Sequence, residues 1–183
     1  MKRLIATLGV MVLILSVSAT WAGKAEKNAE KRESLDAMAA EVLEELFADS
    51  KSAKELSGEA YGYAVFSNLK VAIGISGGGG SGVAVGGGKR IYMKMGTGGI
   101  GFGIGAQKYS VIFFFEDEKH FTSFTEKGWQ ADTGAQAAAG DKGANAAATF
   151  RNGTAVFQMT EKGLMASADV TGTKYWQNDK LNK

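Results

Sequence analysis

Four residues near the middle of the chain have types and spacing suited to binding an anion. Lys89 and Arg90 follow three glycines, and Tyr92 and Lys94 come next at two-residue steps. In a β-strand, Arg90, Tyr92 and Lys94 would share one face. Cations beside an amphipathic aromatic ring fit anionic lipid head groups, each contributing about 1 kcal/mol near an anionic surface. The alternative is a set of solvated residues that protect a strand edge.

A second basic group lies near the start of a predicted helix. It comprises Lys24, Lys27, Lys31 and Arg32. Acidic residues follow toward the C-terminal end of the same helix, so the charge order opposes the helix dipole. We therefore expect this helix to be stabilised by docking on the rest of the protein.

The chain offers no convincing catalytic or metal-binding constellation. His120 is the single histidine and there are no cysteines, so the usual zinc site cannot be built. As a general base, His120 would have only nominal partners in Ser110, Ser123 and Asp117. The glycine motifs at residues 77–82 and 96–101 do not open a helix, as a dinucleotide site requires. We predict a protein that is not an enzyme and uses no metal or cofactor.

The first 22 residues have the layout of a secretory signal peptide. Lys2 and Arg3 precede an apolar run from Leu4 to Val17, and small residues lead to Ala22. The alternative is a retained membrane anchor, for which the run is short. Without residues 1–22, the 21 basic residues become 19, which balance 19 acidic ones. Overall charge then gives no support for nucleic-acid binding. Because lipidation would require a cysteine, we expect a periplasmic or secreted protein that is not a lipoprotein.

The following segment, residues 23–57, is predicted to be helical. Its apolar residues recur three and four apart, which favours a stripe packed on the domain, with a membrane-binding amphipathic helix as the alternative. The stripe comprises Leu35, Met38, Ala39, Val42, Leu43 and Leu46. Continuing the register would bury Asp49, so we predict a break near Ala48, a cap at Asp49 or Ser50, and a stop at Gly58.

Residues 58–176 are predicted to form a glycine-rich β domain with one short helix. The expected strands cover residues 60–66, 69–76, 83–85, 89–95, 99–107 and 110–115, with a turn at Ser67-Asn68 and a flexible segment at 77–82. Between positions 99 and 105, glycine alternates with larger apolar residues, which gives one face without side chains. That face indicates either tight curvature and close packing or a surface for a ligand.

The second half of this region has clearer signals for helix ends and turns. Asp117 can cap a helix over 118–127 that turns Phe121 and Phe124 inward and ends at Gly128. Small residues follow, with a hairpin predicted at 140–143 and helices at 136–139 and 144–148 as the alternative. Asn152-Gly153 predicts a tight hairpin before a strand over 154–159. A turn at 161–163 precedes a strand over 164–176, and the polar tail 177–183 is expected to fray.

The order of these pieces resembles the SYLF domain family. The resemblance covers residues 28–175 and rests on segments that are individually weak but specific in this order. They are AYGYAVF at 60–66, KVAIGI at 70–75, GVAV at 82–85, GIGFGIGAQ at 99–107, VIFFF at 111–115, Gly128-Trp129, EKGLMA at 161–166 and Gly172-Thr173-Lys174. The family usually has proline where Ser67 stands here, and its bacterial members are often lipoproteins.

The resemblance implies a lipid-binding domain. SYLF domains bind phosphoinositides and actin in eukaryotes and occur widely as exported bacterial proteins. An exported protein would not normally meet actin, so that partner is not expected. The basic N-terminal segment that eukaryotic members use on membranes corresponds only loosely to the group from Lys24 to Arg32.

The sequence as a whole predicts an α+β protein. N-terminal helices should pack on a strongly curved, glycine-rich antiparallel sheet or barrel. The expected function is non-enzymatic phospholipid binding in the bacterial cell envelope. The alternative is a structural or protein-interaction module of the envelope without a lipid ligand. The candidate lipid-binding residues are Lys24, Lys27, Lys31, Arg32, Lys89, Arg90, Tyr92 and Lys94.

Overall fold

A computed structural model describes the chain except residues 1, 131–135, 138–148, 166–167 and 170–171. Side chains at 1–22, 73–75, 100–104, 130–148 and 166–171 are also outside the description. The elements are α1 (Lys2–Asp49), α2 (Lys51–Glu59), β1 (Gly62–Gly86), β2 (Lys89–Phe115), α3 (Glu118–Lys127), β3 (Trp129–Gln130), β4 (Gln136–Ala137), β5 (Thr154–Thr160), β6 (Gly163–Leu164), β7 (Ala168–Asp169) and β8 (Thr173–Gln177). The predicted hairpin at 140–143 and its helical alternative lie mostly outside the described residues.

Two very long strands form the centre of the fold. β1 and β2 pair antiparallel from Gly62 opposite Phe115 to Gly86 opposite Lys89, with one irregularity near residue 74. Gly87 and Gly88 make the connecting turn at φ 56° and 74°, where glycine carries no steric penalty. The predicted turn at Ser67-Asn68 and the flexible segment at 77–82 are therefore wrong. Pairing with a continuous partner keeps both segments extended despite their turn-like composition.

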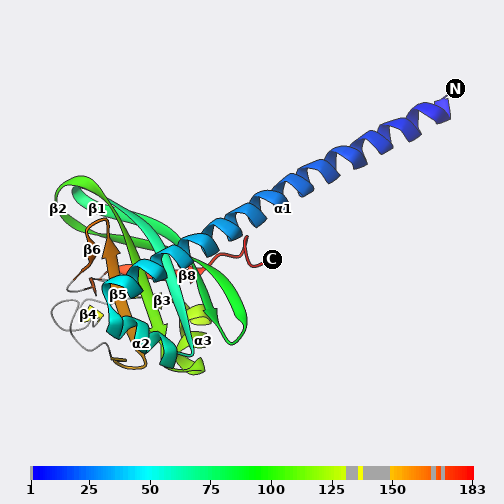
Figure 1. Cartoon of the computed structure of the whole chain (residues 1–183). Helices are drawn as coiled ribbons and strands as arrows, with labels where there is room; N and C mark the ends of the chain where they lie inside the picture. Colours follow the sequence, from blue (N-terminus) through cyan, green and yellow to red (C-terminus); the bar gives the residue numbers. More distant parts are fainter. Residues whose placement is uncertain (1, 131–135, 138–148, 166–167, 170–171) are drawn as a thin grey trace.

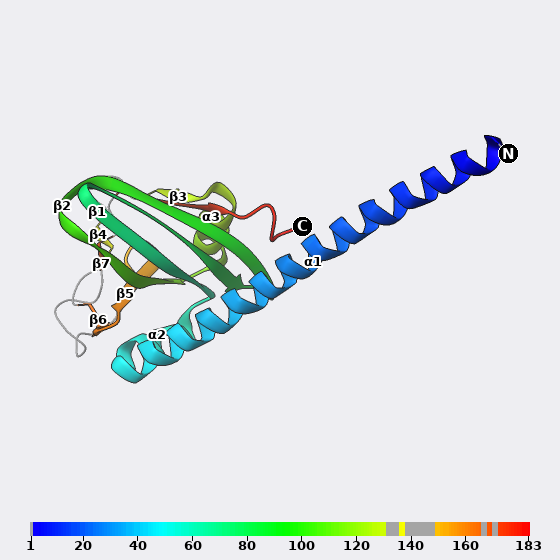
Figure 2. The same cartoon turned by 90° about the horizontal axis from the view of Figure 1, so that it is seen from above.

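The sheet is antiparallel and open, with neighbours in the order β3-β8-β2-β5-β6 and β1 on β2. The prediction of an α+β fold is confirmed, whereas closure into a barrel is not observed. β2 changes partner along its length, pairing with β8 at residues 93–97 and with β5 at 109–115. Figures 1 and 2 show the resulting bend, where both long strands curve over at the end of the domain away from the N-terminus of α1.

Glycines allow β1 to fold back on itself at this bend. A Cβ added at Gly78 would lie 2.6 Å from the carbonyl oxygen of Leu69, and one at Gly82 would overlap the Val65 carbonyl and the Phe66 ring. Carbonyl groups from the first half of the strand thus rest on the bare face of its second half. This close approach leaves no room for a ligand at residues 78–82. The packing interpretation was made for the glycine face at 99–105, where a Cβ at Gly105 would meet no described atom within 4 Å, so close packing is not observed at that residue.

The N-terminal helices break where the polar residues predict. Ser50 adopts an extended conformation between α1 and α2, and its hydroxyl accepts a hydrogen bond of 3.2 Å from the Ala53 amide. The predicted stop at Gly58 is wrong by two residues, since α2 runs to Glu59 and Ala60 is its C-cap. No helix in the described part of the chain is long and apolar enough to span a membrane.

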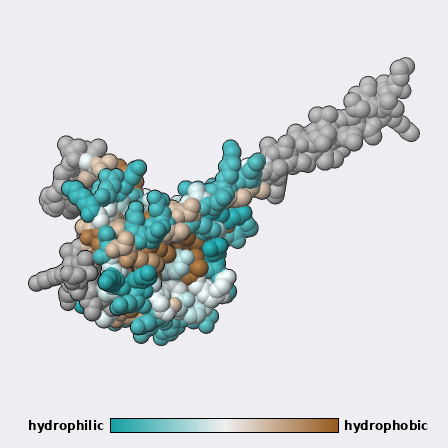
Figure 3. Space-filling model, in the orientation of Figure 1, coloured by the Kyte–Doolittle hydropathy of each residue, from teal (hydrophilic) through white to brown (hydrophobic). Residues whose placement is uncertain are grey.

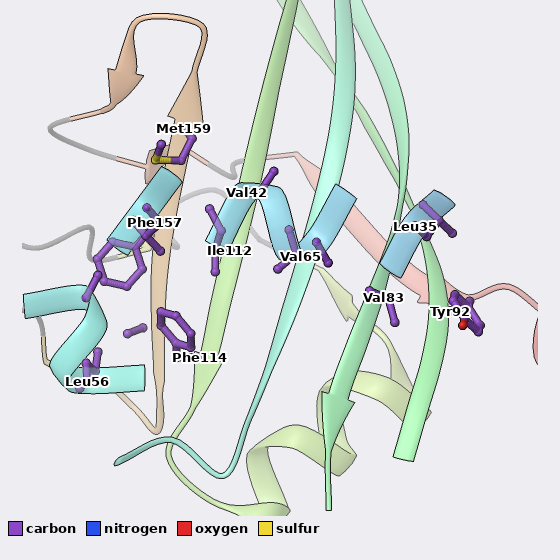
Figure 4. Packing of buried hydrophobic residues seen from close by; sticks show 14 of the residues in the cluster. Leu35, Val42, Leu56, Val65, Val83, Tyr92, Ile112, Phe114, Phe157 and Met159 are labelled. Atoms are coloured by element: carbon purple, nitrogen blue, oxygen red, sulfur yellow. The ribbon is translucent and has the colours of Figure 1, made fainter. Parts of the chain in front are cut away.

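Hydrophobic cores lie on both faces of the sheet. The predicted helical stripe packs on one face, where Leu35, Val42 and Leu46 are buried, which contradicts its use as a free membrane-binding surface. Figure 4 shows helical Leu35 and Val42 close to Val65, Val83 and Ile112 of the long strands. The other face carries α3 and an aromatic cluster made of Phe66, Phe113, Phe115, Phe121, Phe124, Trp129 and Tyr175.

The remaining predictions of turns and helix ends are confirmed, whereas those for the C-terminal strand and tail are wrong. Asp117 caps α3, Gly128 ends it, and Asn152-Gly153 forms a hairpin turn with both residues at positive φ. The strand predicted over 164–176 is instead divided into β6, β7 and β8. The tail is also ordered: Leu181 is buried, and Asn182 donates to and accepts from the backbone of Tyr92 at 2.9 and 2.8 Å. These tertiary contacts replace the expected fraying.

Candidate functional site

The two predicted basic groups lie next to each other because α1 crosses the start of β2. Asp36 of α1 joins them: its carboxylate accepts a 3.2 Å hydrogen bond from the Tyr92 hydroxyl and lies 3.6 Å from Nε of Arg90. Asp36 was not among the predicted site residues, although a carboxylate one residue after the apolar stripe residue Leu35 could have indicated it. The Arg90 side chain is largely exposed, so this ion pair adds little stability.

The C-terminal tail packs at the same place. Arg32 donates to the Leu181 carbonyl at 3.2 Å, and Asn28 donates to the Lys180 carbonyl at 3.0 Å. Arg32 is therefore half-buried in a structural contact, and Tyr92 is only 7% exposed beneath α1. Burial raises the pKa of the Tyr92 phenol, and the Asp36 carboxylate raises it further, so the hydroxyl stays protonated as a donor.

The other basic candidates differ in exposure. Lys24, Lys27, Lys31 and Lys89 are exposed, and Lys94 is half-buried opposite Trp176 of β8. We call the four exposed lysines the basic end. On α1, Lys24, Lys27 and Lys31 are spaced three and four apart and continue the stripe that begins with buried Leu35. By this helical spacing the lysines fall on the side of α1 that carries Leu35. Figure 2 shows that the N-terminal part of α1 extends beyond the sheet.

Acidic residues of the same helical segment occupy another face. Glu26, Glu30 and Glu33 are exposed and also spaced four and three apart, but out of phase with the lysines. The two charge types are therefore segregated around the helix although their numbers nearly cancel. This arrangement suits contact with anionic groups.

A different polar cluster lies inside the sheet. The Tyr175 hydroxyl and both polar side-chain atoms of Asn68 are buried and have no hydrogen-bond partner among the residues that the structure describes. Burial raises the pKa of the Tyr175 phenol, and the nearby Tyr109 adds to this shift. An unpaired buried hydroxyl costs free energy that a well-packed apolar atom would not.

We expect Tyr175→Phe to raise the free energy of unfolding by about 1 kcal/mol, because it removes an unpaired hydroxyl and keeps the ring packing. Urea denaturation at neutral pH measures the change. Tyr92→Phe is the matched control, since it removes a hydroxyl that is bonded to Asp36 and should lower stability by about 1 kcal/mol. A loss of stability in Tyr175→Phe would show that its hydroxyl has a partner in solution.

Comparisons with known proteins support the sequence resemblance. A family model described as Las17-binding protein actin regulator, Ysc84, matches residues 96–183. Beta cell expansion factor A of Aeromonas veronii is 38% identical over 156 residues, covering 84% of this chain. Residues 96–183 of the chain thus match the SYLF family, and the similarity to the relative extends over most of the chain. It spans 60% of the length of this curated relative, and the actin regulation named in the family description is that of other members.

SYLF proteins are known as lipid-binding domains rather than enzymes. The contacts of His120 in this structure are consistent with a structural role. Its ring Nδ1 lies 2.8 Å from Oδ1 of Asp117, which also accepts the His120 backbone amide at 2.9 Å. These bonds cap α3 and hold the pKa of the Asp117 carboxyl below its ordinary value. In the described part of the chain, no hydroxyl bonds to this ring and no acidic, histidine or cysteine cluster could hold a metal.

Proposed function

We propose that this chain is a non-enzymatic phospholipid-binding protein of the bacterial cell envelope, exported by a cleaved signal peptide at residues 1–22. The match to the SYLF family supports lipid binding in general. The predicted signal peptide and the absence of cysteine favour a periplasmic or secreted protein over a lipoprotein.

The observation that carries the proposal is the basic end. Lys24, Lys27 and Lys31 are exposed on the part of α1 that precedes buried Leu35, and Lys89 is exposed at the first residue of β2. Of the remaining candidates, Arg90 pairs with Asp36 and Lys94 is half-buried opposite Trp176, whereas Arg32 and Tyr92 hold the tail and helix in position. Anionic phospholipid head groups are the expected partners, since each lysine near such a surface contributes about 1 kcal/mol.

Vesicle co-sedimentation of the exported protein tests this function. We expect binding to vesicles that contain phosphatidylglycerol, weaker binding to pure phosphatidylcholine, and a loss of binding as salt is raised from 0.01 to about 1 M, where the Debye length falls to about 3 Å. Equal binding to both lipids at all salt concentrations would contradict a role for the lysines. Absence of binding to either vesicle would reject the proposed function.

A protein-interaction module remains the second candidate, favoured by a surface groove. Ala40, Leu43 and Phe47 of α1 line a groove of about 530 Å³ with Lys54 and Tyr63. Figure 3 shows apolar side chains gathered beside α1 on this side of the molecule. Purification of the exported protein as a stable complex that ignores lipid would favour this candidate.

A further inference from the structure

The bend of the β1–β2 hairpin exposes apolar side chains that the sequence analysis did not single out. We define the bend as residues 69–78 of β1 and 96–108 of β2. Leu69 and Val71 are 45% and 41% exposed. They are two residues apart, so both side chains leave β1 on the same face. Two neighbouring aliphatic side chains are therefore in contact with water at the end of the sheet.

The surroundings of this pair are small or basic. Lys108 and Ala106 lie opposite Leu69 and Val71 on β2 and are exposed, as is Lys70 between them. Lys162, in the turn between β5 and β6, shares a groove of about 470 Å³ with Leu69 and Lys108. Lys108 and Lys162 thus lie beside the apolar pair, and Lys70 leaves β1 on the opposite face of the same bend, against one carboxylate in the groove lining, that of Glu161. The local charge is positive.

The backbone of the bend is also accessible. Gly98 and Gly105 are exposed, and a Cβ added at either would meet no atom of the described residues within 4 Å. These two β2 glycines therefore differ from the glycine seam of β1 at residues 78–82, where backbone packs on backbone. Figures 1 and 2 place it at the opposite end of the domain from the N-terminus of α1, so it is separate from the basic end.

We propose that the bend is a second lipid contact, in which Leu69 and Val71 insert into an anionic bilayer while Lys70, Lys108 and Lys162 meet its head groups. This inference rests on the proposed lipid-binding function and adds a site to it. Aliphatic side chains gain free energy by leaving water, and lysines around them gain by approaching anionic phosphates. Their combination at one projecting end is complementary to the interface of such a membrane.

Site-specific fluorescent labels test insertion directly, because the chain has no native cysteine to compete. An environment-sensitive dye is attached to Val71→Cys, to Ala25→Cys beside the basic end, and to Ser123→Cys on α3 as an exposed control. With phosphatidylglycerol vesicles, we expect the label at 71 to shift to the blue and to be quenched by lipids brominated in their acyl chains. The label at 123 should not respond.

Two variants measure how much the apolar side chains and the lysines of the bend each contribute to vesicle affinity. Leu69→Ser with Val71→Ser should weaken vesicle affinity by roughly tenfold or more, since both side chains lose transfer free energy. Replacing Lys70, Lys108 and Lys162 by Gln should cost about fivefold per lysine on anionic vesicles and little on neutral ones. Because these side chains are exposed, the circular dichroism spectrum and melting temperature should remain unchanged.

The labels separate failure of this inference from failure of the proposed function. A response at 25 without one at 71 would leave lipid binding intact and overturn insertion of the bend. A response of the label at 71 that is unchanged when Leu69 is replaced by Ser would also overturn it. If no label responds and the protein does not co-sediment with vesicles, both proposals are wrong.

Discussion

Gly82→Val is expected to lower the free energy of unfolding by at least about 3 kcal/mol, because β1 folds back on itself over this residue. A Cβ at position 82 would overlap the Val65 carbonyl oxygen and the Phe66 ring. Val65 and Phe66 are fully buried, each in one of the two hydrophobic cores. A side chain at position 82 therefore cannot be accommodated by moving one surface group.

Gly98→Val is the matched control for this prediction. Gly98 also lies in a long strand, but it is exposed and a Cβ there would have no neighbour among the described residues within 4 Å. Valine favours extended backbone, so we expect stability to change by less than about 1 kcal/mol. Urea denaturation of the two variants measures the contrast. If Gly82→Val were as stable as Gly98→Val, the close packing of β1 on itself would be wrong.

Neutralising the basic end should produce the largest change in binding. Replacing Lys24, Lys27, Lys31 and Lys89 by Gln removes four exposed charges, each contributing about 1 kcal/mol near an anionic surface. The affinity for phosphatidylglycerol vesicles at low salt should therefore fall by roughly 100- to 1000-fold. Titration of fluorescent vesicles at two salt concentrations measures this loss and should show a weaker salt dependence in the variant.

A second quadruple variant controls for net charge. Lys51 and Lys54 of α2 and Lys119 and Lys127 of α3 are also exposed, and replacing them by Gln changes the total charge equally. We expect at most a small loss of affinity, because these lysines lie on other elements than the basic end. Equal losses in both variants would mean that binding follows total charge rather than this surface.

Local sequence signals predicted the short-range features correctly. The break at Ser50, the cap at Asp117 and the turn at Asn152-Gly153 each depend on a side chain or glycine acting within four residues. The apolar stripe of α1 likewise predicted a docked helix, because helical periodicity fixes which residues share a face. These interactions need no knowledge of distant parts of the chain.

Features that depend on distant residues were predicted poorly. Ser67 and Asn68 look like a turn, but pairing with Ser110 and Tyr109 keeps them in one strand. The polar tail looks frayed, but Asn182 bonds to the backbone of Tyr92, 90 residues away. In both cases, hydrogen bonds to backbone groups far away in the sequence, or packing against them, stabilise the observed conformation. This stabilisation outweighs the weak conformational preferences of the local residues.

The candidate site also combines features that the local sequence determines with features that depend on distant residues. The sequence by itself determined the basic residues, the family resemblance and the α+β class, since composition and periodicity are local properties. Only the tertiary structure decided that Tyr92 is buried under α1, that Asp36 joins the helix to β2, and that Leu69 and Val71 are exposed. Strand periodicity gives two faces but does not say which part of either face another element covers. That choice depends on where α1 ends and where β1 bends.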